Sequence, residues 1–274
     1  MSVTEPLVAV ENLSLAAEAP ILTDVSITLE RGRVLGIVGE SGSGKTLLVK
    51  AILGVLPGGV RKTSGTIELF GEDAGTFEAK KWRSLWTSRL GAVFQDPGSY
   101  LNPSYTVLQH FNEFYRVALK LPRGERRNRA LLALQAVNIR DAEQVLTRYR
   151  HELSGGTLQR ILIALALARS PDVLIADEAT TALDVTVEAE VLDLISDLRD
   201  DGDMSIIVVS HDLAVVSRLA DDVIVLRNGV VVEAGPTQRL LSAPKSDYLR
   251  LLIDSHTKYG IDRVAGHPQA ASAG

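Results

Sequence analysis

The stretch that decides the fold is GESGSGKT at residues 39–46, which follows the apolar run VLGIV at residues 34–38. Its spacing matches G-x-x-x-x-G-K-[ST], in which the glycines let backbone N–H groups turn inward around an anion. The helix expected next, from Lys45 to Leu53, aims the positive end of its dipole at the same place. A strand, a glycine-rich loop and a helix in this order predict a phosphate-binding loop.

The bulk composition excludes several classes of protein. The chain has 274 residues, 46% of them hydrophobic, which suits one large domain or two small ones with a sizeable core. The 34 acidic and 29 basic residues give a net charge of -5, which argues against nucleic-acid binding. No cysteine is present, so disulfides and thiolate metal sites are excluded.

No segment of the sequence has the pattern of a membrane span or a leader. The opening residues, MSVTEPLVAVENLSL, lack the basic stretch and apolar run of a signal peptide. The longest uninterrupted apolar run, Ile161–Ala168, is well short of the roughly 20 residues that cross a bilayer. We therefore expect a soluble chain that reaches a membrane only through a partner or a surface contact.

Apolar strands alternate with helical segments, which predicts an α/β fold with a mostly parallel sheet in a P-loop NTPase (RecA-like) core. Strands are expected at Val34–Val38, Thr66–Leu69, Val173–Ala176 and Ser205–Val209, and a hairpin joins Val223–Leu226 to Val230–Val232. Helices are expected at Lys45–Leu53, Arg127–Val137, Thr157–Ala168 and Val187–Leu198. The N-terminal part is expected to form an antiparallel β subdomain.

The middle of the chain reads as a helical insert, because residues from about 97 to 155 contain no good strand pattern. The prediction is a single domain at residues 1–255, with a helical subdomain at about 97–158 inserted in the core. Residues 256–274, which end in HPQAASAG, are expected to form a C-terminal tail. The basic run RGERRNR at 123–129 fits a solvated helix face better than a headgroup contact.

The glycine-rich loop predicts the phosphate contacts of a bound nucleotide. Lys45 is expected to reach the β- and γ-phosphates, and the Thr46 hydroxyl to ligate Mg²⁺. An ordinary glycine turn is the alternative, which the flanking strand and helix disfavour. The nucleotide-binding residues predicted from the loop are Gly39, Glu40, Ser41, Gly42, Ser43, Gly44, Lys45 and Thr46.

Polar residues at the ends of later strands supply candidate catalytic groups. Asp177, which ends the strand VLIA, is expected to hold Mg²⁺ through its hydration shell, and Glu178 to act as the general base. Gln95 in VFQDP can touch both Mg²⁺ and the attacking water, and His211 after SIIVV can donate to the γ-phosphate. Alone, a carboxylate pair is often a cap, and a single glutamine or histidine is usually at the surface or structural.

Taken together, the motifs resemble the nucleotide-binding subunit of ABC transporters over roughly residues 7–255. The resemblance rests on GESGSGKT, VFQDP, LSGGTLQR, VLIADE, TALD and SHD in the order of that family, and LSGG at 153–156 is specific to it. It implies an ATPase that uses ATP and Mg²⁺ to drive transport.

The same resemblance implies a composite site shared by two subunits. Ser154, Gly155 and Gly156 would close over the γ-phosphate of ATP held by a facing, homologous ATPase subunit, with the helix from Thr157 pointing at that phosphate. Asp184 would lie at the seam of this head-to-tail dimer. Gln95 and the stretch after it would face the membrane subunit.

Two residues depart from the family pattern. The family usually stacks the adenine on an aromatic side chain where this chain has Ala17, so adenine binding is expected to be looser or to use apolar contacts. The residue after the catalytic glutamate is usually proline and is Ala179 here. Because the neighbouring residues are normal, activity is expected to survive.

Within the family, VFQDPGSYLNP, ADEATTALDVT and ADDVIVLRNGVVVEAGPT resemble importers of peptides and nickel. ERGRVLGIVGESGSGKT, LGVLPGGVRKTSG and KYGI are most similar to the D-type ATPase subunit of nickel importers. The resemblance therefore implies a subunit that couples ATP hydrolysis to uptake of nickel or a nickel–chelator complex. A dipeptide or oligopeptide importer is the alternative cargo assignment.

The implied partners are a homologous ATPase, two membrane-spanning permease subunits and, indirectly, an extracytoplasmic binding protein, with no nucleic acid. The implied location is peripheral, on the cytoplasmic face of the inner membrane. A soluble ABC ATPase acting on ribosomes or DNA is disfavoured by the single domain and the acidic balance. A P-loop kinase or GTPase would have no use for LSGG, and an exporter subunit is usually fused to its membrane segment.

Overall fold

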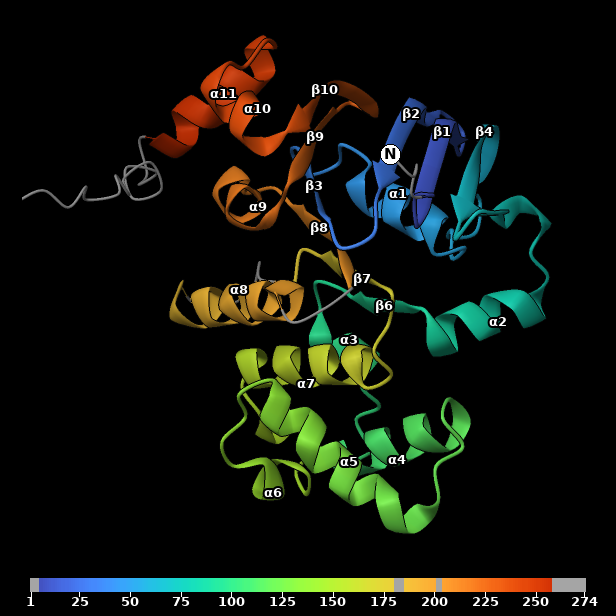
Figure 1. Ribbon diagram of the computed structural model, residues 1–274, viewed down its shortest axis with the longest axis vertical. Helices are drawn as coiled ribbons and strands as arrows, with labels where there is room; N and C mark the ends of the chain where they lie inside the picture. Colours follow the sequence, from blue (N-terminus) through green and yellow to red (C-terminus); the bar gives the residue numbers. More distant parts are fainter. Residues whose placement is uncertain (1–4, 180–184, 201–203, 258–274) are drawn as a thin grey trace, which may run out of the picture.

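The computed structural model describes residues 5–179, 185–200 and 204–257, and Asp184 and the end of the chain from residue 258 lie outside them. A six-stranded sheet runs through the core in the order β10-β9-β3-β8-β7-β6 (Figure 1). Its strands are β3 (Val34–Val38), β6 (Leu90–Val93), β7 (Val173–Asp177), β8 (Ser205–Ser210), β9 (Asp222–Arg227) and β10 (Val230–Pro236). All neighbours pair in parallel except β10, which forms an antiparallel hairpin with β9.

The central strands are buried along their whole length, as a sheet covered on both faces requires. Alternate residues of these strands enter two different hydrophobic cores. In β7, Val173 and Ile175 join one core, and Leu174 and Ala176 join the other. This period of two places one layer of structure on each face of the sheet.

A second, antiparallel sheet covers one face with the order β2-β1-β4-β5. Its strands are β1 (Val8–Ala16), β2 (Pro20–Leu29), β4 (Arg61–Leu69) and the short β5 (Glu72–Asp73). Helix α1 (Lys45–Ile52) contributes to the core between the two sheets through Leu48, Val49 and Ile52. The expected antiparallel N-terminal subdomain is confirmed.

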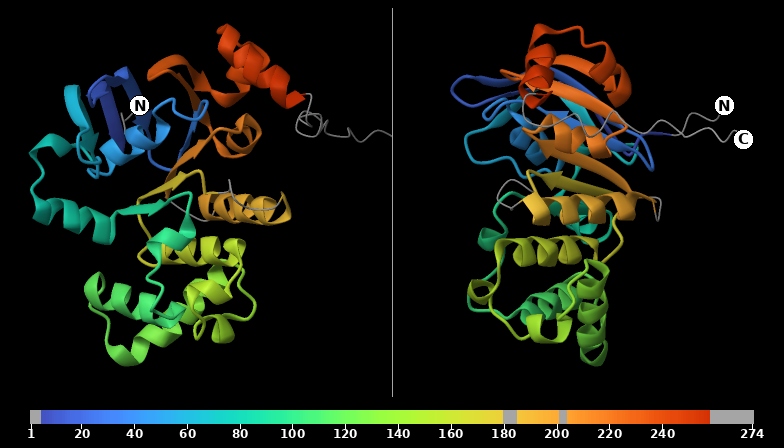
Figure 2. Two further views of the ribbon diagram at one scale, coloured as in Figure 1. Left: turned by 180° about the vertical axis from the view of Figure 1, so that it is seen from behind. Right: turned by 90° about the vertical axis from the view of Figure 1, so that its left-hand side faces the viewer.

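Helices cover the opposite face and build the insert. The helices on the opposite face are α7 (Gly155–Leu167), α8 (Val185–Asp200) and α9 (Leu213–Leu219). The insert consists of α3 (Pro97–Tyr100), α4 (Val107–Val117), α5 (Arg123–Ala136), α6 (Ala142–Val145) and a 3-10 turn at Arg150–Glu152. Figures 1 and 2 show the insert at the far end of the molecule from the antiparallel sheet. The remaining helical segments are a 3-10 turn at Ala74–Thr76, α2 (Ala79–Ser88), α10 (Thr237–Ser242) and α11 (Asp247–Thr257).

The helical insert contains no strand between residues 97 and 155, as the sequence predicts. Helix α5 begins earlier than expected, at Arg123, and so includes the basic run. In that run Arg127 pairs with Glu143, and Arg126 Nε donates to the Leu121 carbonyl at 2.8 Å, so the basic residues lie on a solvated helix face. Helix α7 begins at Gly155 instead of Thr157, because Ser154 caps it. Within the described ranges, no helix has both the length and the apolarity of a membrane span.

Candidate nucleotide site

Three neighbouring parallel strands end at one edge of the sheet and bring the predicted site together. Val38 at the end of β3 lies beside Ser210 of β8, and Asp177 of β7 lies beside Val209 of β8. The loop 39–44, the pair Asp177-Glu178 and His211 follow these positions directly. The carboxyl ends of parallel strands are where open α/β sheets bind their ligands.

The glycines of the loop are required by close packing. A Cβ built on Gly39 would lie 2.1 Å from the Leu226 carbonyl oxygen, and one on Gly44 would lie 2.4 Å from Leu22 Cδ2. Gly44 also has a φ of 102°, a left-handed conformation that glycine adopts without strain. The loop is therefore pressed between β9 and β2, with its N–H groups available to an anion at the start of α1.

Lys45 is 4% exposed and is held by the loop it belongs to. Its Nζ donates to the carbonyl oxygens of Gly39 at 2.7 Å and Glu40 at 2.9 Å. Burial lowers the pKa of the Lys45 ammonium below its ordinary value, and the carboxylates of Glu178 and Asp177 oppose this effect. A phosphate anion beside Nζ would add to the counter-charge that the Glu178 carboxylate already supplies.

Thr46 and Asp177 form the predicted magnesium ligands. The Thr46 hydroxyl donates to Asp177 Oδ1 at 3.3 Å, and Asp177 is 3% exposed. Burial raises the pKa of the Asp177 carboxyl, while the hydrogen bond from Thr46 acts in the opposite direction. A hydroxyl and a carboxylate are hard oxygen ligands that fit Mg²⁺, which keeps several waters and takes its other ligands from substrate phosphates. A bound cation would also compensate the buried carboxylate.

Glu178 lies between two cationic or potentially cationic groups. Its Oε1 is 3.9 Å from Lys45 Nζ and 3.7 Å from His211 Nδ1. Its backbone N–H donates to the Val209 carbonyl at 2.9 Å, which fixes it against β8. Its φ of 49° is left-handed, a conformation that non-glycine residues adopt at a cost and that recurs at functional sites. The geometry joins Lys45, Glu178 and His211, as the sequence predicts.

Gln95 is the predicted residue that the structure does not bring into contact with the others. It follows β6 at the same sheet edge, but its side chain is exposed, and no described residue forms a hydrogen bond with it. Its role with Mg²⁺ and water stays a prediction. Sequence reasoning did not single out Tyr100, an exposed aromatic residue whose ring stacks on Phe94 beside Gln95. The only sign of Tyr100 in the sequence is its position shortly after Gln95, in VFQDPGSY.

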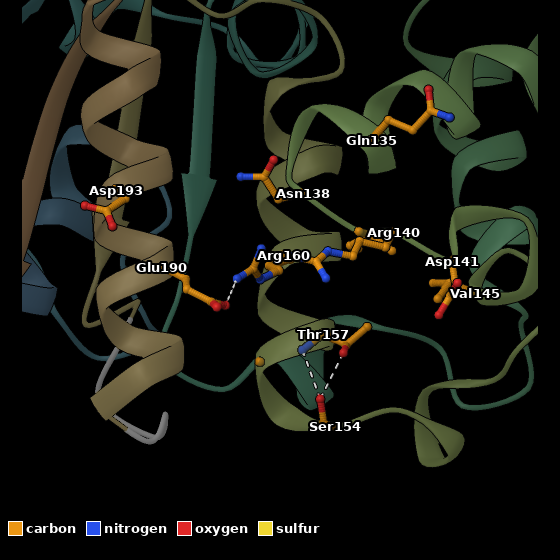
Figure 3. Close-up of a pocket in the computed structure, with 12 residues that line it drawn as sticks. Gln135, Asn138, Arg140, Asp141, Val145, Ser154, Thr157, Arg160, Glu190 and Asp193 are labelled. Carbon is orange, nitrogen blue, oxygen red and sulfur yellow. Dashed lines mark hydrogen bonds and ion pairs between the residues drawn. The ribbon is translucent and has the colours of Figure 1, made fainter.

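The LSGG segment lies apart from the loop in this chain. Ser154 is exposed and caps α7: its Oγ accepts from the Thr157 N–H at 3.3 Å and lies 2.9 Å from Thr157 Oγ1. Among the described residues, no hydrogen bond or ion pair joins residues 153–157 to residues 39–46. Figure 3 shows Ser154 and Thr157 at one end of a hollow of about 850 Å³ between α7, α8 and the end of α5.

The position expected to face the adenine borders a second hollow. Ala17, Pro20, Ile21, Gly58 and Arg61 are among the residues that line about 690 Å³ at the tip of the β1–β2 hairpin. Ile21 connects this hollow to the phosphate loop, since its carbonyl oxygen lies 3.5 Å from a Cβ built on Gly44. The hollow therefore adjoins the end of the loop where α1 begins, and no aromatic side chain lines it.

The fold and this site define a P-loop nucleotide-binding protein. The family model for the ABC transporter matches residues 22–181. The chain belongs to the family of ABC transporter ATP-binding domains, whose members bind ATP with Mg²⁺. This finding confirms the resemblance seen in the sequence at the level of the family.

Curated relatives carry transport names. A peptidoglycan transport ATP-binding protein of Agrobacterium fabrum is 39% identical over 93% of this chain, which spans 48% of that relative's length. A putative peptide import ATP-binding protein of Brucella abortus is 38% identical over 92% of this chain and 77% of the relative.

Solved structures of the family share the fold. The cbiO1 structure from Clostridium perfringens, part of the ABC transporter complex cbiONQ, has a TM-score of 0.76 and 28% identity over 95% of this chain and 97% of that one. The dimeric ATP-binding cassette MJ0796 bound to ADP and phosphate has a TM-score of 0.73 and 25% identity over 84% of this chain and 98% of that one.

Proposed function

We propose that this chain is the ATP-hydrolysing subunit of an ABC importer whose cargo is a peptide. The observation that carries the ATPase part is a pair of contacts at the sheet edge: Lys45 Nζ lies 3.9 Å from Glu178 Oε1, and the Thr46 hydroxyl donates to Asp177 Oδ1 at 3.3 Å. The putative peptide import proteins among the curated relatives support peptide cargo over the nickel complex that the sequence resemblance favours, and the relative named for peptidoglycan transport does not point to nickel either. Nickel uptake stays the alternative, since the ATPase itself need not touch the cargo.

The hydrolysis mechanism follows from the side chains at the edge. Lys45 exchanges a loop carbonyl for the β- and γ-phosphate oxygens, which gain charge as the bond to the leaving group breaks. Thr46 and Asp177 would hold Mg²⁺, which would supply positive charge to the phosphate oxygens. Glu178 accepts a proton from the attacking water, and His211, beside it, donates a hydrogen bond to the γ-phosphate.

The dimer is the second part of the proposal. Ser154, Gly155 and Gly156 stand at the N-terminus of α7 with no contact to their own loop, which supports their closing over ATP on a facing ATPase subunit. The dimeric state named for MJ0796 supports the same arrangement. Asp184 is proposed for the seam. A homologous ATPase, two permeases and an extracytoplasmic binding protein would complete the importer, with this subunit peripheral on the cytoplasmic face of the inner membrane.

The permease is proposed to dock near Gln95. A hollow of about 410 Å³ lies between β6, α3, α4 and α7, lined in part by Tyr100, Tyr105 and Phe114. Tyr100 is 54% exposed and Tyr105 39% exposed, and Tyr100 stacks on Phe94 beside Gln95. Apolar and aromatic surface of this kind is typical of protein–protein contacts.

ATP hydrolysis and the identity of the cargo are tested in separate experiments. Purified protein, alone and with the homologous ATPase, should hydrolyse ATP in a Mg²⁺-dependent way, and a chain without nucleotide turnover in either form would contradict the ATPase proposal. In cells lacking the gene, uptake of a radiolabelled dipeptide should fall while uptake of labelled nickel stays at the wild-type level. The reverse result would favour the nickel alternative.

A further inference from the structure

A hydrogen bond from the phosphate loop to the C-terminal helix α11 holds the loop from outside the proposed site. The Glu40 N–H donates to the Tyr248 hydroxyl at 3.0 Å, joining the second residue of the loop to a helix 208 positions away. Tyr248 is 5% exposed, so this hydroxyl is buried against the loop. Neither residue is among the predicted catalytic or magnesium-binding groups.

Both backbone polar groups of Glu40 are engaged in hydrogen bonds. Its carbonyl oxygen accepts from Lys45 Nζ at 2.9 Å and from the Ser43 N–H at 3.2 Å. Its N–H is the group that Tyr248 holds. The backbone of the loop at Glu40 is therefore held on one side by the Lys45 ammonium and on the other by the Tyr248 hydroxyl.

Helix α11 presents Tyr248 in a fixed position. The guanidinium carbon of Arg227 lies 4.6 Å from the centre of the Tyr248 ring, and Arg227 directly follows Leu226, against which Gly39 packs. At the start of α11, the carboxylate of Glu233 accepts from the Ser246 N–H at 2.9 Å and from the Lys245 N–H at 3.1 Å. Burial raises the pKa of the Tyr248 phenol, so its oxygen stays a neutral hydroxyl at neutral pH.

We propose that Tyr248 is a positioning residue for nucleotide binding, which couples the C-terminal helix α11 to the phosphate loop through the Glu40 N–H. This inference rests on the proposed ATPase function and deepens it. A loop already held in its binding path loses less conformational freedom when the triphosphate arrives, so the contact favours binding. It touches neither the attacking water nor the leaving group, so the chemical step at saturating ATP is unaffected.

The test is Tyr248→Phe in the full chain, which removes the hydroxyl but keeps the ring against Arg227. Losing one hydrogen bond should raise the Kd and KM for ATP by about three- to tenfold, with kcat and the nucleotide-free Tm close to wild type. Tripolyphosphate should lose affinity by the same factor, because the effect acts on the phosphate loop. The matched control is Tyr115→Phe, a tyrosine 1% exposed in the helical insert, which should bind ATP as the wild type does.

A second variant tests the position of the ring without removing the hydroxyl. Arg227→Lys keeps the positive charge but loses the flat guanidinium over Tyr248, so it should weaken ATP binding in the same direction by a smaller factor. If both variants bind ATP and tripolyphosphate like the wild type, or if Tyr248→Phe lowers only the Tm, the proposal is wrong. Wild-type protein that fails to bind ATP would instead contradict the proposed function itself.

Discussion

The Thr46 hydroxyl lies 3.3 Å from Asp177 Oδ1 and donates to it, which joins the first turn of α1 to the end of β7. The two residues are 131 positions apart in the sequence. This contact places a hydroxyl and a buried carboxylate together at the proposed magnesium site, beside the proposed phosphate loop. Replacing this carboxylate should therefore change both the stability of the protein and its affinity for Mg²⁺.

Asp177→Asn should stabilise the nucleotide-free protein at pH 7 while reducing Mg²⁺-dependent hydrolysis. The pKa of Asp177 is higher in the folded than in the unfolded protein, so the folded state favours the protonated carboxyl. Its contribution to the free energy of unfolding is therefore complete below the unfolded pKa of 3.8 and is lost as the pH rises through the folded pKa. The neutral amide removes the buried charge, so the Tm at pH 7 should rise and the Tm should depend less on pH above 3.8. Loss of a magnesium ligand should lower Mg²⁺ affinity at least about tenfold.

Thermal melts from pH 4 to 8 and ATPase assays against Mg²⁺ concentration measure both effects. Asp193→Asn is the matched control, because that carboxylate on α8 is exposed and pairs with Arg218 at the surface. A lower Tm for Asp177→Asn at pH 7 would show that the buried carboxylate stabilises the empty site.

Glu178→Gln should keep ATP binding and lose turnover. The amide retains the shape of the side chain beside Lys45 and His211 but cannot accept the proton of the attacking water. General-base catalysis contributes about 100- to 10,000-fold, so kcat should fall by at least about 100-fold with little change in Kd. Gel filtration with ATP should show a trapped dimer. Hydrolysis near the wild-type rate would exclude Glu178 as the base.

Ser154→Arg should stop hydrolysis at the partner's loop and leave this chain's own ATP binding intact. Ser154 is exposed, and among the described residues its hydroxyl bonds only to Thr157, so a long cation there obstructs the facing subunit instead of this chain's site. The measurement pairs the variant with the wild-type homologous ATPase and follows ATP bound to each. Asn128→Arg, on the exposed face of α5, is the control. If the variant loses its own ATP, the composite-site proposal fails.

Ala17→Tyr should tighten ATP binding. The hollow next to Ala17 has no aromatic lining, and a ring there can stack on the base. Stacking of a base on an aromatic side chain contributes about 1–3 kcal/mol, so the Kd for ATP should fall about tenfold. Tripolyphosphate, which has no base, should bind the variant and the wild type equally. An equal gain for both ligands would show that the tyrosine acts on the loop and not on the adenine.

Much of the candidate site was predictable because its residues directly follow the carboxyl ends of parallel strands. An apolar strand before GESGSGKT and another before Asp177 predict a parallel sheet, and parallel strands carry their following residues to a single edge. The continuous apolar runs of β3 and β7 likewise predict a sheet covered on both faces, and the two hydrophobic cores confirm it. The finer assignment of nickel rested on short stretches of sequence, one of which includes the phosphate loop itself, and relatives named as putative peptide import proteins favour peptide instead.

The sequence by itself determined the strand–loop–helix of the proposed phosphate site, the order of the family's motifs and the family, because these depend on local spacing and on the succession of strands and helices along the chain. Only the tertiary structure decided which side chains meet. Glu178 lies between Lys45 and His211, and Tyr248 holds the loop at Glu40. Such contacts join segments far apart in the chain, and they follow from how helices and strands pack, which no local pattern encodes.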